Sequence, residues 1–257
     1  MIDAARYFDR CATLISQYEL AVRAVDGFHG DEAAIQSLLD EELDDLRDVI
    51  ANSFNWQSEL YDHWVFSEQG AESFLKKAKV GVCERLGEVH LRIRQNHVVL
   101  MVTFLNACLE DIHRAILREE PTLLRWDRKI PLSRVLSSST EKILEEEIER
   151  EIVRIAQQPV SARASYFAET LNLSWYGDPI VHMFEEASNL RDDILHENPD
   201  AKVTELDLSN ARMVSIAVPL ACISQASIPY PNVFTPLGEF NEEIRALLVS
   251  EGRLFGR

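Results

Sequence analysis

The sequence predicts an all-α fold, an antiparallel bundle of long helices, and three observations carry this prediction. Apolar residues recur every three or four positions along most of the chain, which is the helical period. The 257 residues include only 9 Gly and 9 Pro, fewer than loop-rich all-β chains usually carry. No pair of segments shows the alternation that marks β-strands. The length fits one large or two small domains, with 46% apolar residues available for a core.

The sequence pattern of the N-terminal region predicts a helical hairpin. Residues 3–25 form an amphipathic pattern that Gly27 and Gly30 interrupt, and Asp31 can cap a second helix that runs to about residue 51. The second helix carries an acidic run, interpreted as a solvated face, with a docking surface for a basic partner as the alternative. Its members are Asp40, Glu41, Glu42, Asp44, Asp45 and Asp48. The aromatic-rich residues 52–70 predict a bend and a short helix at the seam with the main body.

The strongest helix signal lies between residues 89 and 120, where Pro121 ends it. One apolar stripe steps by four and three residues along this segment. The stripe consists of Val98, Val102, Leu105, Leu109, Ile112 and Ile116. The spacing of Ser138 and Glu141 is that of a capping box, so we expect the next helix to begin there and to stop at Pro159.

Four further helices are expected in the C-terminal half. They cover residues 161–173, 180–198, 208–226 and 240–254. Asp178 is the expected cap of the second, with Pro179 at its first helical position, and Pro219 is expected to kink or divide the third. We therefore predict an N-terminal helical hairpin over 1–66, a helical bundle over 67–228 and a C-terminal helical extension over 229–257.

The charge balance limits the classes of partner. Lys and Arg number 26 against 43 Asp and Glu, a net charge of −17, which excludes a uniformly basic coat for nucleic acid. Any contact with nucleic acid therefore needs a local basic patch, and the sequence contains two clusters of basic residues. Each cluster is either part of a track that binds RNA or an ordinary solvated face with intrachain ion pairs. The first contains Lys76, Lys77, Lys79, Arg85, Arg92 and Arg94, and the second contains Arg114, Arg118, Arg125, Arg128, Lys129 and Arg134.

The cysteines and the N-terminus favour a cytoplasmic protein without a membrane partner. Cys11, Cys83, Cys108 and Cys222 form no CxxC pair, so neither a disulfide framework nor a zinc site is expected. The chain begins without the basic head and apolar run of a signal peptide. The longest apolar run, residues 98–105, is too short to span a bilayer.

The most informative residues lie at the end of the predicted helix over residues 180–198. A helical wheel places Arg191 in the middle of an apolar face. A buried guanidinium needs a partner, so Arg191 should pair with a carboxylate, for example on a neighbouring helix, or point into a cleft or interface. His196 follows five residues later, which is about 140° around a straight helix. A reoriented last turn before Pro199, or a symmetric dimer, would bring the two side chains to one substrate.

The sequence Arg191-Asp192-x-x-x-His196 near the end of a late helix resembles the signature of the HEPN superfamily, which is Arg, four to six residues, then His. Asp192 fills the polar position after the Arg, where Asn is commoner. Two other Arg-x4-His matches, Arg85–His90 and Arg92–His97, lack a polar residue there. The resemblance covers about residues 71–226 and implies a bundle of HEPN type, leaving roughly the first 60 residues unexplained.

The resemblance implies a metal-independent endoribonuclease that needs no cofactor, acts as a homodimer and serves as a toxin or antiviral effector beside an antitoxin or regulator. Arg191, Asp192 and His196 are the catalytic residues that it implies. The residue types suit the chemistry, because histidine can act as base or acid near neutral pH and arginine matches phosphate oxygens. Asp192 either orients one of these groups or remains a surface carboxylate.

Two other functions stay open. A dimetal carboxylate site would use Glu110 and His113, with Asp193 and His196 as a loose second pair, although His113 is better interpreted as a hydrogen-bonded core histidine. A non-catalytic helical interaction or regulatory module would use the acidic face as its working surface and treat Arg191 as a structural ion pair.

Overall fold

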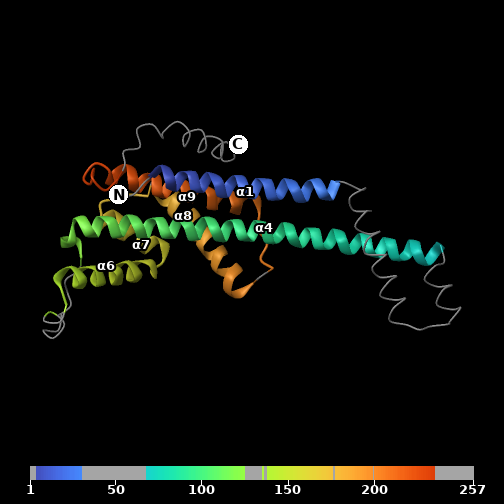
Figure 1. The fold of residues 1–257 in the computed structure, drawn as a ribbon, viewed down its shortest axis with the longest axis horizontal. Coiled ribbons are helices and arrows are strands. Elements are labelled where there is room, and N and C mark those ends of the chain that lie inside the picture. Colours follow the sequence, from blue (N-terminus) through green and yellow to red (C-terminus); the bar gives the residue numbers. More distant parts are fainter. Residues whose placement is uncertain are drawn as a thin grey trace. The chain divides into compact units, whose positions relative to one another are not determined.

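The computed structural model describes residues 4–30, 68–124, 135, 138–175, 177–198 and 200–234. All regular structure within these residues is helical, so the predicted all-α class is confirmed. The described residues form six α-helices, which are labelled in Figure 1. They also form a 3₁₀ turn over Pro121–Leu123 and a π-turn over Asp193–Glu197. The α-helices are α1 (Ala4–Gly30), α4 (Glu68–Glu119), α6 (Thr140–Ala156), α7 (Val160–Thr170), α8 (Asp178–Asp192) and α9 (Glu205–Ala226).

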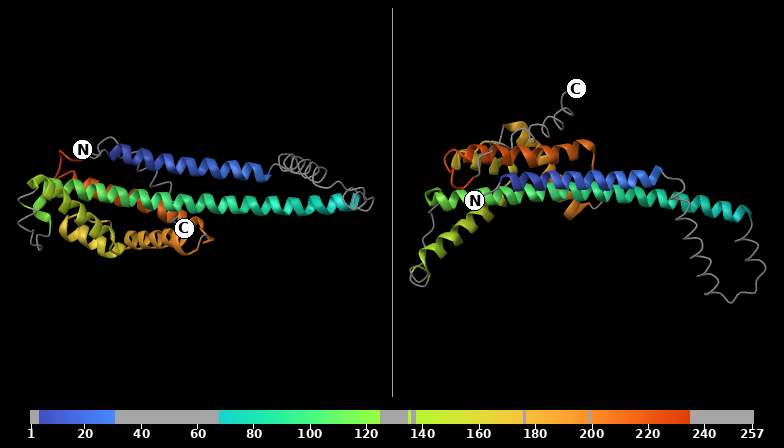
Figure 2. Two further views of the ribbon diagram at one scale, coloured as in Figure 1. Left: turned by 60° about the horizontal axis from the view of Figure 1, so that its bottom comes forward. Right: turned by 45° about the horizontal axis from the view of Figure 1, so that its top comes forward.

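The chain divides into two compact units, and helices α1 and α4 pass from one to the other. One unit comprises Met1–Ser16 and Gln95–Arg257, and the second comprises Gln17–Arg94. The first unit contains α6, α7, α8 and α9 and all the candidate site residues; Figure 2 gives two further views of these helices. Some of the predictions fall outside the described residues. These are the helices expected over 31–51 and 240–254 and the segment boundary expected at residue 66.

The two longest helices extend beyond their predicted bounds. Helix α4 begins at Glu68 instead of residue 89, and its predicted apolar stripe, from Val98 to Ile116, is buried. Helix α1 continues through Gly27 to Gly30, where an interruption was expected. That expectation was wrong because glycine within a helix costs only about 1 kcal/mol relative to alanine and does not force a break.

Helix α6 packs along α4 through a small apolar cluster. Ile148 and Ile152 of α6 meet Leu117 and Leu124, all of them buried. The N-cap of α6 is Ser139, whose Oγ accepts the Lys142 N–H at 3.3 Å. The sequence analysis placed this cap at Ser138, which is one residue before the observed N-cap.

Helix α9 forms the centre of the first unit. Buried residues occur all round it, as in a helix that packs against neighbours on every side. Its first turn holds a capping box that the sequence analysis missed, in which Thr204 and Asp207 each accept the other's backbone N–H. By length and composition alone α9 could cross a membrane, but 72% of its most apolar window is buried within the protein.

Pro219 neither divides nor ends α9, which is continuous on both sides of it. Proline has no N–H, so it leaves the carbonyl oxygen of Ser215, four residues earlier, without its helical donor. Tyr7 of α1 supplies the missing donor, because its hydroxyl donates to this oxygen at 2.9 Å inside the core. The contact fixes the first turns of α1 against α9.

Replacing Tyr7 by phenylalanine is expected to lower the free energy of unfolding by roughly 1–3 kcal/mol, because the buried Ser215 carbonyl would keep only the weak Cys11 thiol donor, at 3.9 Å. The cost should shrink in a Pro219→Ala background, where the backbone N–H restored at that position can donate to Ser215. Urea unfolding of the two single variants and the double variant measures this coupling. Additive effects would show that the proline and the tyrosine act independently.

Candidate functional site

Helix α8 carries Arg191 and Asp192, and the π-turn after it carries His196. The first turn of α8 differs from the prediction. Gly177, not Asp178, is the N-cap, with a φ of 91° that favours glycine. Asp178 and Pro179 are the first two helical residues, so Asp178 lies one position after the cap. An acidic residue in the first turn still complements the helix dipole.

The predicted apolar face of α8 is the face that packs on the core. Phe184 and Ala187 are buried, and the Phe184 ring lies 5.7 Å from the ring of Trp175. Arg191, one further turn along this face, keeps 30% of its side chain exposed. Packing of the helix therefore draws this guanidinium toward the interior, as the wheel predicted.

Arg191 is paired, but with its own neighbour. Its Nη1 donates to Asp192 Oδ1 at 2.8 Å, whereas a carboxylate on another helix had been suggested as the partner. Its Nε is buried and has no hydrogen-bond partner among the described residues. Asp192 thus holds one edge of the guanidinium, while a second donor is unsatisfied.

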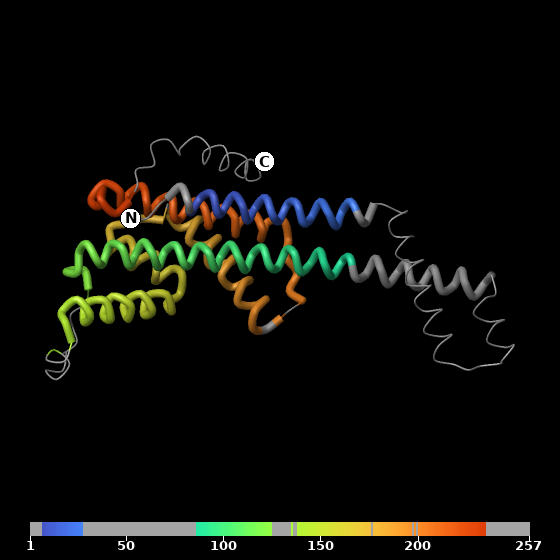
Figure 3. The backbone as a smooth tube through the Cα atoms, in the orientation of Figure 1, coloured from blue at the N-terminus to red at the C-terminus, as the bar shows by residue number. Residues whose placement is uncertain are grey.

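The last turn of this helix is a π-turn, over Asp193–Glu197, which the Asn198 N–H closes by donating to the Asp193 carbonyl at 2.8 Å. Asn198 precedes Pro199 and leaves the helical region, with φ −142° and ψ 88°. Hydrogen bonds from i+5 to i take more residues per turn than an α-helix, so residues five apart come nearer to one face. Figure 3 shows the chain continuing from α8 into this turn before it reverses into α9.

The structure distinguishes the three histidines that fit the Arg-x4-His spacing. His90 Nε2 lies 3.0 Å from Asp26 Oδ1. His97 is buried and accepts a hydrogen bond from Arg212 Nε at 3.1 Å. His196 is exposed and makes no hydrogen bond or ion pair with another described residue. Of the three, His196 is the one with an exposed imidazole that has no partner among the described residues.

The basic residues expected to form an RNA track are in part used within the chain. Arg114 donates to Glu149 and to Asp111, each at 2.6 Å, and Arg118 pairs with Glu145 at 2.7 Å. These contacts match the alternative interpretation as intrachain ion pairs. Outside the described residues lie Arg125, Arg128, Lys129 and Arg134, as do the side chains of Lys76, Lys77, Lys79 and Arg85.

His113 is a hydrogen-bonded core histidine, as predicted. It is 2% exposed, and its Nε2 lies 3.0 Å from the Tyr166 hydroxyl. Burial lowers the pKa of His113 to about 4, and neighbouring arginines add to this lowering against the opposite effect of Glu151. Among the described residues, no three or more His, Cys, Asp or Glu side chains gather as metal ligands would.

The sequence analysis missed a buried arginine, Arg163 on α7, which lines a pocket beside Glu110 and His113. A signal for it exists. Val160, Arg163 and Phe167 follow the three-and-four spacing of one helical face, and all three are buried. A wheel of this helix would have placed a cation on a core face, as it did for Arg191.

No family model matches the chain, and comparison with curated proteins and with solved structures finds no match.

Proposed function

We propose that the protein is a metal-independent endoribonuclease of HEPN type. The observation that carries this proposal is that two side chains near the end of α8 are available for chemistry. The partly buried guanidinium of Arg191 has an Nε without a partner among the described residues, and the imidazole of His196, on the π-turn, is exposed and has no partner among them either. A π-turn inside or at the end of a helix is frequent at functional sites. Arg191, Asp192 and His196 are its catalytic residues.

Each residue has a definite task in this chemistry. The 2′-hydroxyl oxygen forms a bond to the adjacent phosphorus as the bond to the 5′-oxygen breaks, which leaves a 2′,3′-cyclic phosphate and a 5′-hydroxyl. Arg191 stabilises the charge on the phosphate oxygens, and the Asp192 carboxylate holds the guanidinium in place at 2.8 Å. His196 takes the proton from the 2′-hydroxyl or returns one to the 5′-oxygen.

One copy of the chain supplies one imidazole, whereas the reaction needs both a base and an acid. A homodimer that joins two copies of this face would provide two His196 side chains for the two roles. Because Arg114 and Arg118 are used in intrachain pairs, these two cations are not open to RNA, which favours a narrow range of RNA substrates. We place such an enzyme in the cytoplasm, as a toxin or antiviral effector restrained by an antitoxin or regulator.

Incubation of the full chain with total RNA in the presence of EDTA tests this function. We expect discrete cleavage products that end in 2′,3′-cyclic phosphate and 5′-hydroxyl groups, because no metal ion takes part. Absence of cleavage, cleavage only without EDTA, or products with a 3′-hydroxyl would contradict the proposal. A mass measurement in solution tests the homodimer separately.

A non-catalytic helical interaction module is the second candidate. The ion pairs of Arg114 and Arg118, and that of Arg191 with Asp192, favour it because they use up cations that RNA would otherwise meet. On this alternative no RNA is cut, and Arg191→Ala destabilises the protein by removing a structural pair.

A further inference from the structure

The position of His196 depends on the backbone that carries it. Its imidazole is exposed and makes no hydrogen bond or ion pair with another described residue, so the described contacts do not fix the side chain itself. His196 belongs to the π-turn over Asp193–Glu197. Turns of this kind are rare and helix ends fray, so a π-turn at the end of a helix needs a contact elsewhere that holds it closed.

A series of three hydrogen bonds connects the π-turn to helix α4. The Asn198 N–H donates to the Asp193 carbonyl at 2.8 Å and thereby closes the turn. The Ala201 N–H donates to the Asn198 carbonyl at 3.0 Å. The Ala201 carbonyl in turn accepts a hydrogen bond from Gln95 Nε2, on α4, at 3.0 Å. The Gln95 side chain therefore attaches the turn to the helical bundle.

The end of this series that reaches α4 is buried. Gln95 is 2% exposed and Ala201 is 4% exposed. Because water does not reach the contact between them, it cannot replace the Gln95 amide as the donor, and a buried carbonyl without a donor is costly. Asn198, in contrast, is exposed, so the two backbone hydrogen bonds in which it takes part compete with water. Gln95 thus supplies the protected link of the series.

The segment that follows the turn is also fixed at its other end. Val203 is buried, and Thr204 and Asp207 form the capping box that begins α9. The chain between the π-turn and α9 is therefore held by α9 on one side and by Gln95 on the other. The hydrogen bond of Gln95 is the one that passes directly, through Ala201, to the turn.

Opening of the turn would change where the imidazole lies. The Asp193 carbonyl would then accept the Glu197 N–H, as in an α-helix, instead of the Asn198 N–H. In that register His196 lies about 140° around the helix from Arg191, whereas the wider π-turn brings residues five apart nearer to one face. Closure of the turn therefore decides whether the two side chains can meet one phosphodiester.

We propose that Gln95 is a positioning residue for His196. Its buried hydrogen bond to Ala201 holds the π-turn closed and so places the imidazole for proton transfer. This role rests on the proposed ribonuclease function. Gln95 acts through the backbone and touches neither the RNA nor the reacting atoms.

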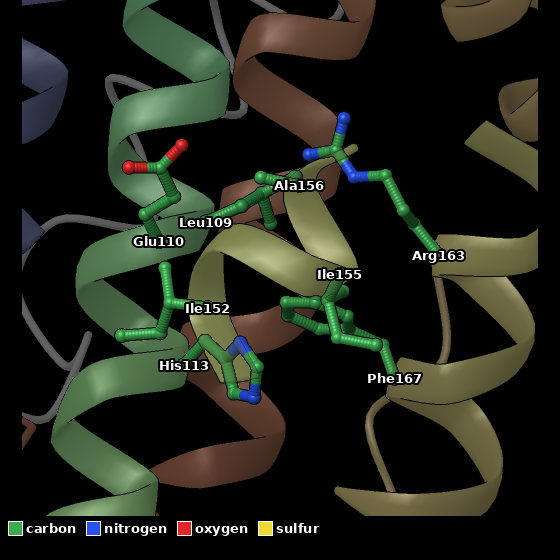
Figure 4. Close-up of a pocket in the computed structure, with 8 residues that line it drawn as sticks. All are labelled: Leu109, Glu110, His113, Ile152, Ile155, Ala156, Arg163 and Phe167. Atoms are coloured by element: carbon green, nitrogen blue, oxygen red, sulfur yellow. The ribbon is translucent and has the colours of Figure 1, made fainter. Parts of the chain in front are cut away.

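Amide hydrogen exchange of the full chain, followed by NMR, tests the hold on the turn without any RNA. Gln95→Met keeps the length of the side chain but removes the donor, so the amides of Asn198 and Ala201 should exchange at least several-fold faster. The amides of His113 and Phe167, two residues that line the small pocket in Figure 4, share none of these hydrogen bonds. Their exchange should not change, and it reports any general loss of stability.

Cleavage kinetics test the catalytic consequence. Gln95→Met should lower kcat by up to about 10²-fold with little change in KM, because a misplaced base slows the chemical step more than binding. In a His196→Ala background the same substitution should have no further effect on kcat, since Gln95 acts through that imidazole. The matched control is Gln225→Met, which removes a side-chain amide that donates to the Ser174 carbonyl at 2.8 Å. It should leave kcat unchanged.

A second variant keeps the test independent of the folding of Gln95→Met. Gln95→Asn retains an amide that is one methylene too short to reach Ala201, and we expect the same results from it. The proposal is wrong if neither variant speeds exchange at Asn198 and Ala201, if both cleave at the wild-type rate, if the losses multiply in the His196→Ala background, or if Gln225→Met lowers kcat equally. Absence of cleavage by the wild type would overturn the ribonuclease function alone, because exchange decides separately whether Gln95 holds the turn closed.

Discussion

Replacing His196 by alanine is expected to slow RNA cleavage by about 10²–10⁴-fold, the usual contribution of a general acid or base. The imidazole is exposed and has no partner among the described residues, so its removal should change the free energy of unfolding by less than about 0.5 kcal/mol. Initial rates on a cleaved RNA, measured together with thermal melting, separate the loss of chemistry from the loss of fold.

Arg191→Lys provides a second test of the same site. Lysine keeps the positive charge but lacks the planar fork that can contact Asp192 and a phosphate at once. We expect a large loss of cleavage with little change in stability. A structural ion pair without a catalytic role would instead leave the cleavage rate nearly intact.

His182→Ala is the matched control for both variants. His182 lies on α8, is 73% exposed and, within the described part of the chain, pairs with Glu186 at 3.5 Å. Its removal should leave cleavage unchanged. If His182→Ala and His196→Ala lose activity equally, or if His196→Ala cuts at the wild-type rate, the assignment of His196 is wrong.

Lowering the pH from 7 to 5 is expected to reduce the free energy of unfolding by about 4 kcal/mol, through two buried histidines. Burial lowers the pKa of His97 to about 3, with a further lowering by the Arg212 charge, and burial lowers the pKa of His113 to about 4. In the unfolded chain both titrate near 6.5. Between pH 6.5 and 4 the unfolded state therefore binds more protons than the folded state, so the stability that is complete above pH 6.5 is lost as the pH falls.

Urea unfolding at pH 7 and pH 5 measures this dependence. His97→Gln retains a hydrogen-bond acceptor for Arg212 but cannot take up a proton, so this variant should show about half the pH dependence of the wild type. A pH dependence equal to that of the wild type would show that His97 is not buried in its neutral form.

The arrangement of apolar residues along the chain was enough to predict most of the described helices. The stripe from Val98 to Ile116 and the face of α8 that contains Phe184 are buried as expected, because burial of apolar surface dominates the choice of face. The same pattern placed Arg191 on the buried face. Local signals at the helix ends were less reliable, and both Ser138 and Asp178 missed the true cap by one residue.

The sequence by itself therefore determined the class of fold, the buried faces and the position of Arg191 on one of them, since these follow from periodicities within a single helix. Only the tertiary structure decided which polar groups meet. The Tyr7 hydroxyl donates a hydrogen bond to the Ser215 carbonyl, which Pro219 leaves without its helical donor. These two residues are 208 positions apart, and no local sequence pattern contains such a contact. The burial of Arg163, with no ion pair to another described residue, likewise depends on helices that pack together, because burial and pairing are properties of the assembled core.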